Sequence, residues 1–471
     1  MKEVLNKKGN TIFISVSSPI IIRNFFLIPN GVLDLLKKSG SKIIILVPEQ
    51  AYKDVKRDFE NDNIVVEAVS VNWKRNFFQK IYYFISTYLI FTEGSKLFAS
   101  KGIRLDIPVA GGKSYTYYLK LLISSTLGKI KFVKNYIAPK IDSLVYRERP
   151  YKNLFNKYKP DLVFLPDVHS IQDVTVLREA KRQKIKTIGM PGSWDHFPKR
   201  FEPLRVDKLM VWNEVIKKEA IELQNYDSKN VFITGAPYYD IFTKNEFLLS
   251  REDFFNKFNL NQNKKLIFYS SGSKYAPDDG DVVDIILKSI KENKFNKSAQ
   301  IFLRPYPGVK FDHDKFDKFN NEDLIYVDWI KPKKIFGHSG HSWYPTIDSI
   351  FHFYNTLYHS DIIVNTYSSV SVEASALLKP IININFDGYK NRPFEQSIKR
   401  FRQLSHYKNV MDTEGVKNVS NAVDLINTLN NFINDPSCNY VNTKELCDKM
   451  CWKVDGKSSE RIANHILNFI P

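Results

Sequence analysis

Cysteine is scarce in this sequence. The 471 residues include three cysteines, all near the C-terminal end: Cys438, Cys447 and Cys451. They are too few for the disulfide framework of a small secreted domain, and their spacing does not match a zinc site. The scarcity therefore predicts a protein of a reducing compartment.

Long hydrophobic runs are also missing. The run from Ile81 to Phe91 is shorter and more polar than the roughly 20 apolar residues that span a bilayer. The apolar stretch near the N-terminus is interrupted by Ser17, Ser18 and Pro19, so it does not read as a secretory signal. We therefore expect a cytoplasmic protein, with peripheral contact at the inner membrane face as its only membrane association.

Acidic residues are outnumbered by basic ones, 51 to 69, which gives a formal net charge of +18. Residues 71–160 alone hold 17 Lys and Arg against 4 acids, and the basic residues alternate with aromatic ones. An interfacial helix on an anionic membrane surface would show this pattern. Buried aromatics with a solvated rim of lysines would show it too, so both interpretations stay open. A nucleic acid partner is not expected, because no binding motif accompanies the charge.

Short β-branched runs alternate with polar or helical stretches, which is typical of parallel sheets covered by helices. Seven runs lie in the first half, at 11–16, 42–48, 64–69, 161–166, 186–190, 208–212 and 231–234. Five lie in the second, at 265–269, 300–303, 324–327, 361–364 and 380–384. We predict an α/β protein with two Rossmann-like doubly wound domains that face a cleft. Their expected bounds are 1–243, with the basic aromatic insertion at 71–160, and 244–456; a helix in 457–471 packs back across the junction.

Polar groups gather at three predicted strand ends of the second half. Glycine and serine turns let backbone N–H groups approach a phosphate, and arginine binds phosphate with two hydrogen bonds. A carboxylate in the first turns of the following helix can accept hydrogen bonds from ribose hydroxyls. Simple capping of the expected helix Val370–Leu378 would explain one serine but not the cluster. The candidate donor-nucleotide residues are Ser271, Gly272, Ser273, Arg304, Thr366, Ser368, Ser369 and Glu373.

Two successive strand ends of the first half each place a carboxylate beside a histidine. Asp167 and His169 form the first pair, and Asp195 and His196 form the second. A general base that takes a proton from a hydroxyl group needs such a side chain facing the cleft. These four residues are therefore the catalytic candidates.

Histidines also gather further along the chain, at His338, His341, His352 and His359. Their spacing does not resemble a closed zinc site, and no cysteine joins them. We expect no metal and no other cofactor.

Several of these motifs together resemble a known family. They are GMPGSWD at 189–195, VWNE at 211–214, VFITGAPYYD at 231–240, LRPYP at 303–307 and NTYSS at 365–369 with Glu373. Over roughly residues 161–387 the chain is similar to the two-domain GT-B glycosyltransferases of bacterial surface-polysaccharide synthesis, in the clan of CDP-glycerol glycerophosphotransferases and capsule sugar transferases. Two departures from the clan stand out. Tyr306 stands where the clan often has histidine, and the glycerophosphotransferase pattern usually has aspartate where Asn365 or Thr366 stands.

The resemblance implies a metal-independent glycosyltransferase. Its C-terminal domain would bind a nucleotide-sugar donor, and its N-terminal domain would bind a lipid-linked or cell-surface glycan acceptor, as in capsule or lipopolysaccharide synthesis. Three alternatives stay open: a CDP-glycerol-type polyol-phosphate transferase, a nucleotide-sugar 2-epimerase and a non-catalytic protein that binds anionic lipid.

Overall fold

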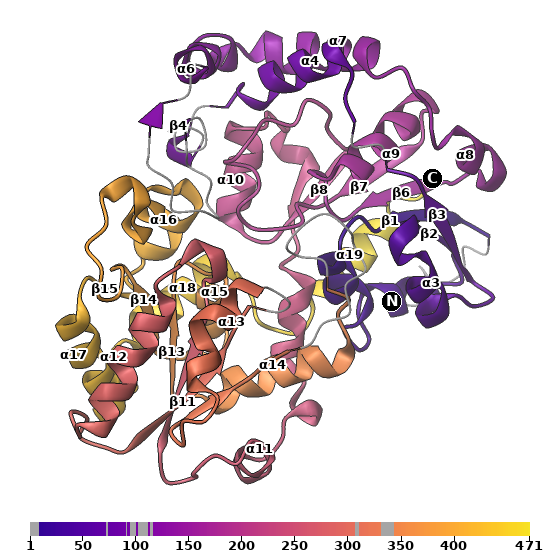
Figure 1. Ribbon diagram of the computed structural model, residues 1–471. Coiled ribbons are helices and arrows are strands. Elements are labelled where there is room, and N and C mark those ends of the chain that lie inside the picture. The colour runs from indigo at the N-terminus through magenta and orange to yellow at the C-terminus, as the bar shows by residue number, and fades with distance from the viewer. Residues whose placement is uncertain are drawn as a thin grey trace.

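The computed structural model describes residues 9–71, 74–90, 92–94, 100–101, 112–113, 116–306, 310–330 and 343–471. Two parallel sheets, each covered by helices, stand side by side in Figure 1. We call the part around the first sheet the N-terminal domain and the part around the second sheet the C-terminal domain. The predicted α/β fold class is confirmed.

The first sheet has seven parallel strands in the order β3-β2-β1-β6-β7-β8-β9. The strands are β1 (Thr11–Ser15), β2 (Lys42–Pro48), β3 (Ile64–Val69), β6 (Leu162–Leu165), β7 (Lys186–Gly189), β8 (Lys208–Val211) and β9 (Val231–Ile233). Residues 43–47 in β2 are fully buried, as expected for a strand covered on both faces. All seven predicted strands are therefore present.

The second sheet has six parallel strands in the order β12-β11-β10-β13-β14-β15. The strands are β10 (Lys265–Ser270), β11 (Ala299–Arg304), β12 (Ile325–Val327), β13 (Ile362–Asn365), β14 (Ile381–Ile384) and β15 (Lys417–Val419). Five were predicted, and β15 was not. In both sheets the strand order reverses beside the domain's first strand, and ligands of doubly wound sheets bind at that crevice.

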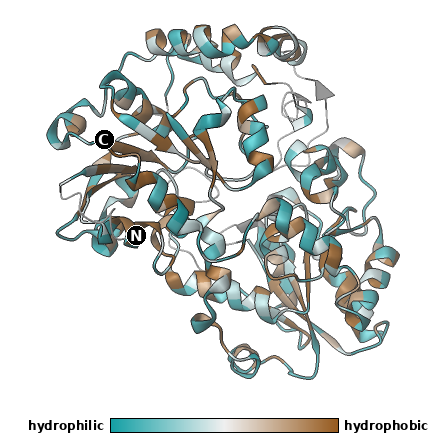
Figure 2. Cartoon of the chain, turned by 180° about the vertical axis from the view of Figure 1, so that it is seen from behind, coloured by the Kyte–Doolittle hydropathy of each residue, from teal (hydrophilic) through white to brown (hydrophobic). Residues whose placement is uncertain are grey.

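Helices surround both sheets, and Figure 2 shows hydrophobic strands between helices of mixed hydropathy. In the N-terminal domain they are α1 (Pro19–Ile21), the π-helix η1 (Ile22–Phe26), α2 (Val32–Lys38), α3 (Glu49–Phe59), α4 (Phe77–Thr87), α6 (Tyr117–Ser125), α7 (Ala138–Val145), α8 (Lys152–Tyr158), α9 (Ile171–Arg182) and α10 (Glu214–Glu222). The later helices are α11 (Arg251–Lys257), α12 (Asp279–Lys291), α13 (Lys310–Phe316), α14 (Ile347–His359), α15 (Val370–Ser375), α16 (Ser405–Met411), α17 (Ala422–Asn434), α18 (Tyr440–Met450) and α19 (Ser458–Leu467).

Helix α15 is shorter than the predicted Val370–Leu378. It ends at Ser375, and the chain then turns, with Leu378 in the left-handed region at a φ of 53°. The prediction extended the helix because the residues that follow Ser375, Ala-Leu-Leu, favour helix, but this local preference yields to the turn that leads into β14.

The basic aromatic insertion forms a helical layer with α4, α6 and α7, drawn along the top of Figure 1. A small separate core of Leu89, Ile90, Ile123, Ala138 and Phe201 supports it. Of the 22 large hydrophobic side chains exposed in the described residues, 14 lie between positions 77 and 144. Within the described part of the chain, no helix is both long and apolar enough to cross a membrane.

The last helix, α19, packs on the N-terminal domain, against α2 and the short helix η5 (Pro237–Thr243). The Asp240 carboxylate accepts the backbone N–H groups of Ser458 at 3.0 Å and Ser459 at 2.7 Å, which caps the start of the helix. The Arg461 Nε donates to the carbonyl of Thr234 at 2.8 Å. The chain therefore crosses between the two domains a second time, just before α19.

Candidate functional site

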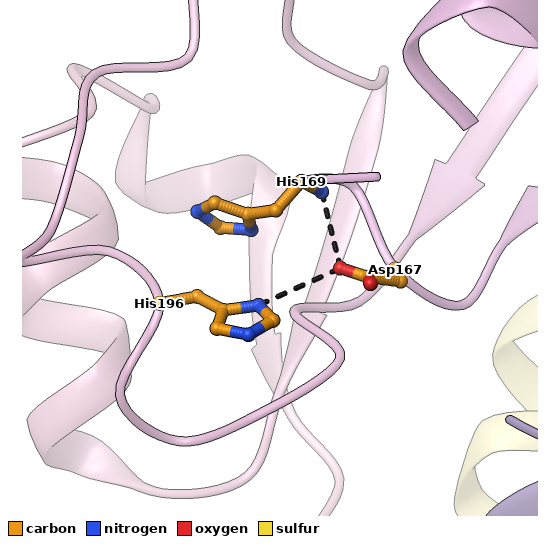
Figure 3. A group of neighbouring side chains, drawn as sticks. All are labelled: Asp167, His169 and His196. Atoms are coloured by element: carbon orange, nitrogen blue, oxygen red, sulfur yellow. Dashed lines mark hydrogen bonds and ion pairs between the residues drawn. The ribbon is translucent and has the colours of Figure 1, made fainter. Parts of the chain in front are cut away.

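The catalytic candidates meet where β6 and β7 end, at the reversal point of the first sheet. His196 Nδ1 lies 3.5 Å from Asp167 Oδ1, and the ring centres of His169 and His196 lie 4.6 Å apart (Figure 3). Because β6 and β7 are parallel neighbours, their carboxyl ends lie together. The two predicted carboxylate–histidine pairs thus form one group.

Local hydrogen bonds fix the turn that carries Asp167. The Ser170 side chain caps α9 by accepting the backbone N–H of Asp173 at 2.9 Å, so the helix begins at Ile171, two residues after His169. The Asp173 carboxylate accepts the N–H of Asp167 at 2.9 Å and the Ser15 hydroxyl at 2.6 Å. A Cβ atom at Gly192 would lie 2.6 Å from Cγ of Asp167, so only glycine lets the β7 turn approach this closely.

The electrostatics give the two histidines different roles. Burial would raise the pKa of Asp167, but the hydrogen bond and charge of His196 hold it below its usual range, so Asp167 is anionic. Burial, together with His196, Arg200 and Lys199, lowers the pKa of His169 well below its usual value. His169 is therefore neutral, whereas His196 lies beside the anionic Asp167.

The Asp195 carboxylate differs from that of Asp167 in its main partner, which is a lysine. It forms an ion pair with Lys199, and its Oδ1 is 4.0 Å from His196 Nε2. Burial would raise the pKa of Asp195, but Lys199 and His406 hold it well below its usual range. His406 belongs to α16 and approaches Asp195 to 4.0 Å, so this turn contacts the C-terminal domain.

Asp167, His169 and His196 could also hold a metal ion, since their ligand atoms lie within 4.8 Å of one another. Two nearby positive charges oppose this: Arg200 donates to the His169 carbonyl, and Lys199 binds Asp195. The expected absence of a metal stays a prediction. Of the four histidines that gather further along the chain (His338, His341, His352 and His359), His338 and His341 lie outside the described residues.

At the reversal point of the second sheet, hydrogen bonds within the protein hold the turn after β10. Gly272 donates its N–H to Asp279 at 2.7 Å, and Ser273 donates its N–H to Ser271 Oγ at 2.9 Å. These two N–H groups are therefore already bonded within the protein. The Ser273 hydroxyl is buried without a hydrogen-bond partner, and Ser273 has a φ of 53°. The predicted nucleotide contacts of this turn stay predictions, with the hydroxyl as its available donor.

Arg304 is buried and paired. Its Nε lies 2.7 Å and its Nη2 lies 2.6 Å from Asp328 Oδ2, and Nη2 also donates to Thr356 at 3.3 Å. His352 binds the same carboxylate at 2.9 Å. The predicted phosphate contact of Arg304 stays a prediction, and the Asp328 carboxylate leaves fewer of its N–H groups for a ligand.

The hydroxyl cluster after β13 divides into bound and available groups. Thr366 donates to Asp279 at 3.3 Å, and Ser368 Oγ accepts the N–H of Val370 at 3.3 Å. Ser369 is exposed and makes no side-chain capping bond. Ser368 thus accepts the first backbone N–H of α15, while Ser369, at the N-cap position, presents its hydroxyl to solvent.

The N-terminal domain contributes Arg23 to this edge, a residue that sequence reasoning missed. Arg23 Nη1 lies 3.9 Å from Glu373 Oε1, and its guanidinium lies 4.0 Å above the Tyr238 ring. Burial raises the pKa of Glu373 to about 7, against the lowering effect of Arg23 and Arg304. The available signal was topological: Arg23 follows β1, and the segment after the first strand of a doubly wound domain borders the ligand crevice.

The fold and the site together define a GT-B-type transferase: two Rossmann-like domains whose reversal points are joined by the contacts of Arg23 with Glu373 and of Asp195 with His406. A family model described as CDP-Glycerol:Poly(glycerophosphate) glycerophosphotransferase matches residues 179–468. The chain belongs to this family. The search of curated proteins gave no match.

Solved structures share the fold over nearly the whole chain. A UDP-GlcNAc 2-epimerase from Neisseria meningitidis bound to UDP-GlcNAc aligns with a TM-score of 0.52 and 14% identity, over 97% of this chain and 100% of its own. The S. aureus MnaA–UDP structure aligns with a TM-score of 0.53 and 14% identity, over 97% and 96%. The 2-epimerase from Rickettsia bellii gives 0.54 and 12%, over 98% and 97%. The predicted GT-B fold, the resemblance to this clan and a transferase with a nucleotide-activated donor are confirmed.

Proposed function

We propose that this protein moves a glycosyl group from a nucleotide-sugar donor to a lipid-linked or cell-surface glycan, without a metal. The observation that carries the proposal is the group formed by Asp167, His169 and His196, which lies beside the contact of Asp195 with the C-terminal domain. A carboxylate–histidine pair at the mouth of a cleft is suited to activate a hydroxyl group. The donor residues around Glu373 lie on the other domain.

In the proposed step, His196 takes the proton of an acceptor hydroxyl, and Asp167 stabilises the resulting imidazolium. The acceptor oxygen bonds to the anomeric carbon of the donor, while the bond from that carbon to the phosphate oxygen breaks. The nucleoside diphosphate leaves with the bonding electron pair. Arg23, Arg304 and the Ser369 hydroxyl would stabilise its growing negative charge.

A second candidate is glycerophosphoryl transfer, and the family match over residues 179–468 favours it. The same base would activate the acceptor hydroxyl, whose oxygen would attack the phosphorus of CDP-glycerol and release CMP. The departures at Asn365 and Thr366 favour a sugar donor instead. The choice between these donors is an experimental one.

The test is a thermal-shift screen of the purified protein against UDP-, GDP- and dTDP-sugars, CDP-glycerol, CDP and CMP. A ligand present at 100 times its dissociation constant stabilises the folded protein by about 2.7 kcal/mol. A shift with one nucleotide sugar supports glycosyl transfer, and a shift with CDP-glycerol alone selects the second candidate. A folded sample that no nucleotide stabilises would contradict both, and would favour the non-catalytic lipid-binding alternative.

We also propose that the insertion rests on an anionic membrane surface. The exposed apolar side chains of α4, α6 and α7 support this, together with exposed lysines such as Lys129 and Lys131. The enzyme would then act at the inner membrane face, where a lipid-linked acceptor is anchored.

A further inference from the structure

A pocket of about 130 Å³ lies between the insertion and helix α9 of the N-terminal domain. Its outer wall comes from α4 and the segment after α7, and its floor comes from one face of α9. His169, Arg200 and Glu202 also line it, so the pocket extends from the insertion to the candidate catalytic group. None of its lining residues belongs to the C-terminal domain. The pocket is therefore separate from the candidate donor-nucleotide residues, which follow strands of the second sheet.

His169 in this pocket has unused hydrogen-bonding capacity. Its side chain is only 7% exposed, and neither ring nitrogen has a hydrogen-bond partner. The nearest carboxylate, on Glu202, is 3.7 Å from Nε2. A buried imidazole without partners is costly, so a ligand that supplies a hydroxyl group would satisfy it. The ring next to it is that of His196, the proposed general base.

The pocket wall carries two arginine–tyrosine stacks. The Arg75 guanidinium lies 3.7 Å from the Tyr83 ring centre, and Arg178 lies 3.7 Å from that of Tyr146. Two hydrogen bonds, of 2.8 and 2.9 Å, hold Arg178 to Asp142. Arg75 is half-buried and, among the described residues, rests only on its tyrosine, so its N–H groups are available to an anion.

We infer that this pocket binds the terminal unit of the acceptor, and that this unit is rich in hydroxyl groups and carries a phosphate or carboxylate. The anionic group would bind Arg75, and a hydroxyl group would reach His169 and, beside it, His196. The pocket lies beneath helices whose outer faces carry the proposed membrane contact, which suits an acceptor held at a membrane. This inference rests on the proposed transfer function and adds the class of acceptor.

The test compares the wild-type protein with Arg75→Gln and with Lys80→Gln as the matched control. Lys80 is exposed on α4, which begins two residues after Arg75, and it does not line the pocket, so the control makes the same charge change elsewhere. Calorimetric titrations use glycerol 3-phosphate and methyl glucuronide as anionic probes and methyl glucoside as the neutral probe. Nucleotide-induced thermal shifts are recorded for all three proteins.

We expect Arg75→Gln to weaken the binding of at least one anionic probe about tenfold, because a hydrogen bond to a charged group contributes on the order of 1.4 kcal/mol or more. Lys80→Gln should bind as the wild type does, and the nucleotide shift should be equal in all three proteins. The phosphate and carboxylate probes separate the two kinds of anionic acceptor. Probes that fail to bind, or that bind Arg75→Gln and wild type equally, would overturn the pocket assignment. A missing nucleotide shift in the wild type would instead overturn the proposed function.

Discussion

In the proposed mechanism, His196 is the side chain at the N-terminal reversal point on which the reaction depends most. We expect His196→Ala to lower the transfer rate by about 10² to 10⁴, the usual contribution of a general base. Nucleotide binding should not change, because His196 follows a strand of the other domain. The measurement is the turnover rate beside the nucleotide-induced thermal shift.

His313→Ala serves as the control for that variant. His313 is an exposed histidine on α13 that binds Asp317 at 3.0 Å. Its removal should leave turnover unchanged. A His196→Ala protein with full turnover would remove His196 from the proposed mechanism.

Glu373 makes stability depend on pH. Burial raises its pKa to about 7, so the folded state binds a proton more tightly than the unfolded state does. The stabilising effect of that proton is complete below the ordinary glutamate pKa and is lost as pH rises through about 7. The resulting loss of unfolding free energy between about pH 4.5 and 7 is of order 3 kcal/mol.

Glu373→Gln should therefore make the unfolding free energy fall less steeply over that range, in urea titrations at pH 5 and pH 7.5. Arg23→Gln should have the opposite effect. Without Arg23 the pKa of Glu373 rises further, because the charge of Arg23 acts to lower it. Equal pH dependence in the wild type and Glu373→Gln would contradict the buried, protonated state of this carboxyl group.

Sequence reasoning identified the site residues whose position in the fold is fixed by the strand they follow in the sequence. Asp167 and His196 follow apolar strands, and strand ends of a parallel sheet share one edge, so their meeting could be predicted. The pairing of Arg304 with Asp328 could not, because it depends on which strand lies beside β11. The approach of Arg23 to Glu373 depends on how two domains pack, which no local pattern encodes.

At the scale of elements, the strands were easier to predict than the helices. A strand covered on both faces is a continuous β-branched run, as in β2, whereas the three residues of β15 include only one buried side chain. The insertion was ambiguous for a physical reason. Aromatic residues alternating with lysines fit a buried face or a membrane face, and the structure shows a buried side chain at Tyr82 and an exposed one at Phe77.

The exposed face of the insertion should bind membranes through its aromatic side chains. We expect the double variant Phe77→Ser, Phe132→Ser to bind phosphatidylserine vesicles at least tenfold more weakly in co-sedimentation, because each buried Phe contributes about 1.5–3 kcal/mol. The side chains are 69% and 62% exposed, so the fold should not suffer. Tyr440→Ser, on α18 of the C-terminal domain, is the control. Vesicle binding that the double variant retains in full would refute the proposed membrane face.

At the scale of the whole molecule, catalysis should not require a divalent metal. Positive charge on Arg200 and Lys199 surrounds the group formed by Asp167, His169 and His196, and arginines would stabilise the leaving group instead. Dialysis against EDTA should leave turnover unchanged. Loss of turnover that Mg²⁺ or Zn²⁺ restores would contradict this prediction and reassign the three residues as metal ligands.

The proposed function places the base on the first sheet and the donor site on the second, so transfer from donor to acceptor is its central requirement. The most direct measurement is mass spectrometry of the products formed by purified protein from each nucleotide sugar or CDP-glycerol, with membranes of the source cell as acceptor. We predict that the wild type adds a glycosyl unit to the acceptor and releases a nucleoside diphosphate, whereas His196→Ala does neither. Release of CMP with an added glycerophosphate would select the second candidate. Absence of any transfer product with every donor, from a folded protein that binds nucleotide, would contradict the proposed transferase function.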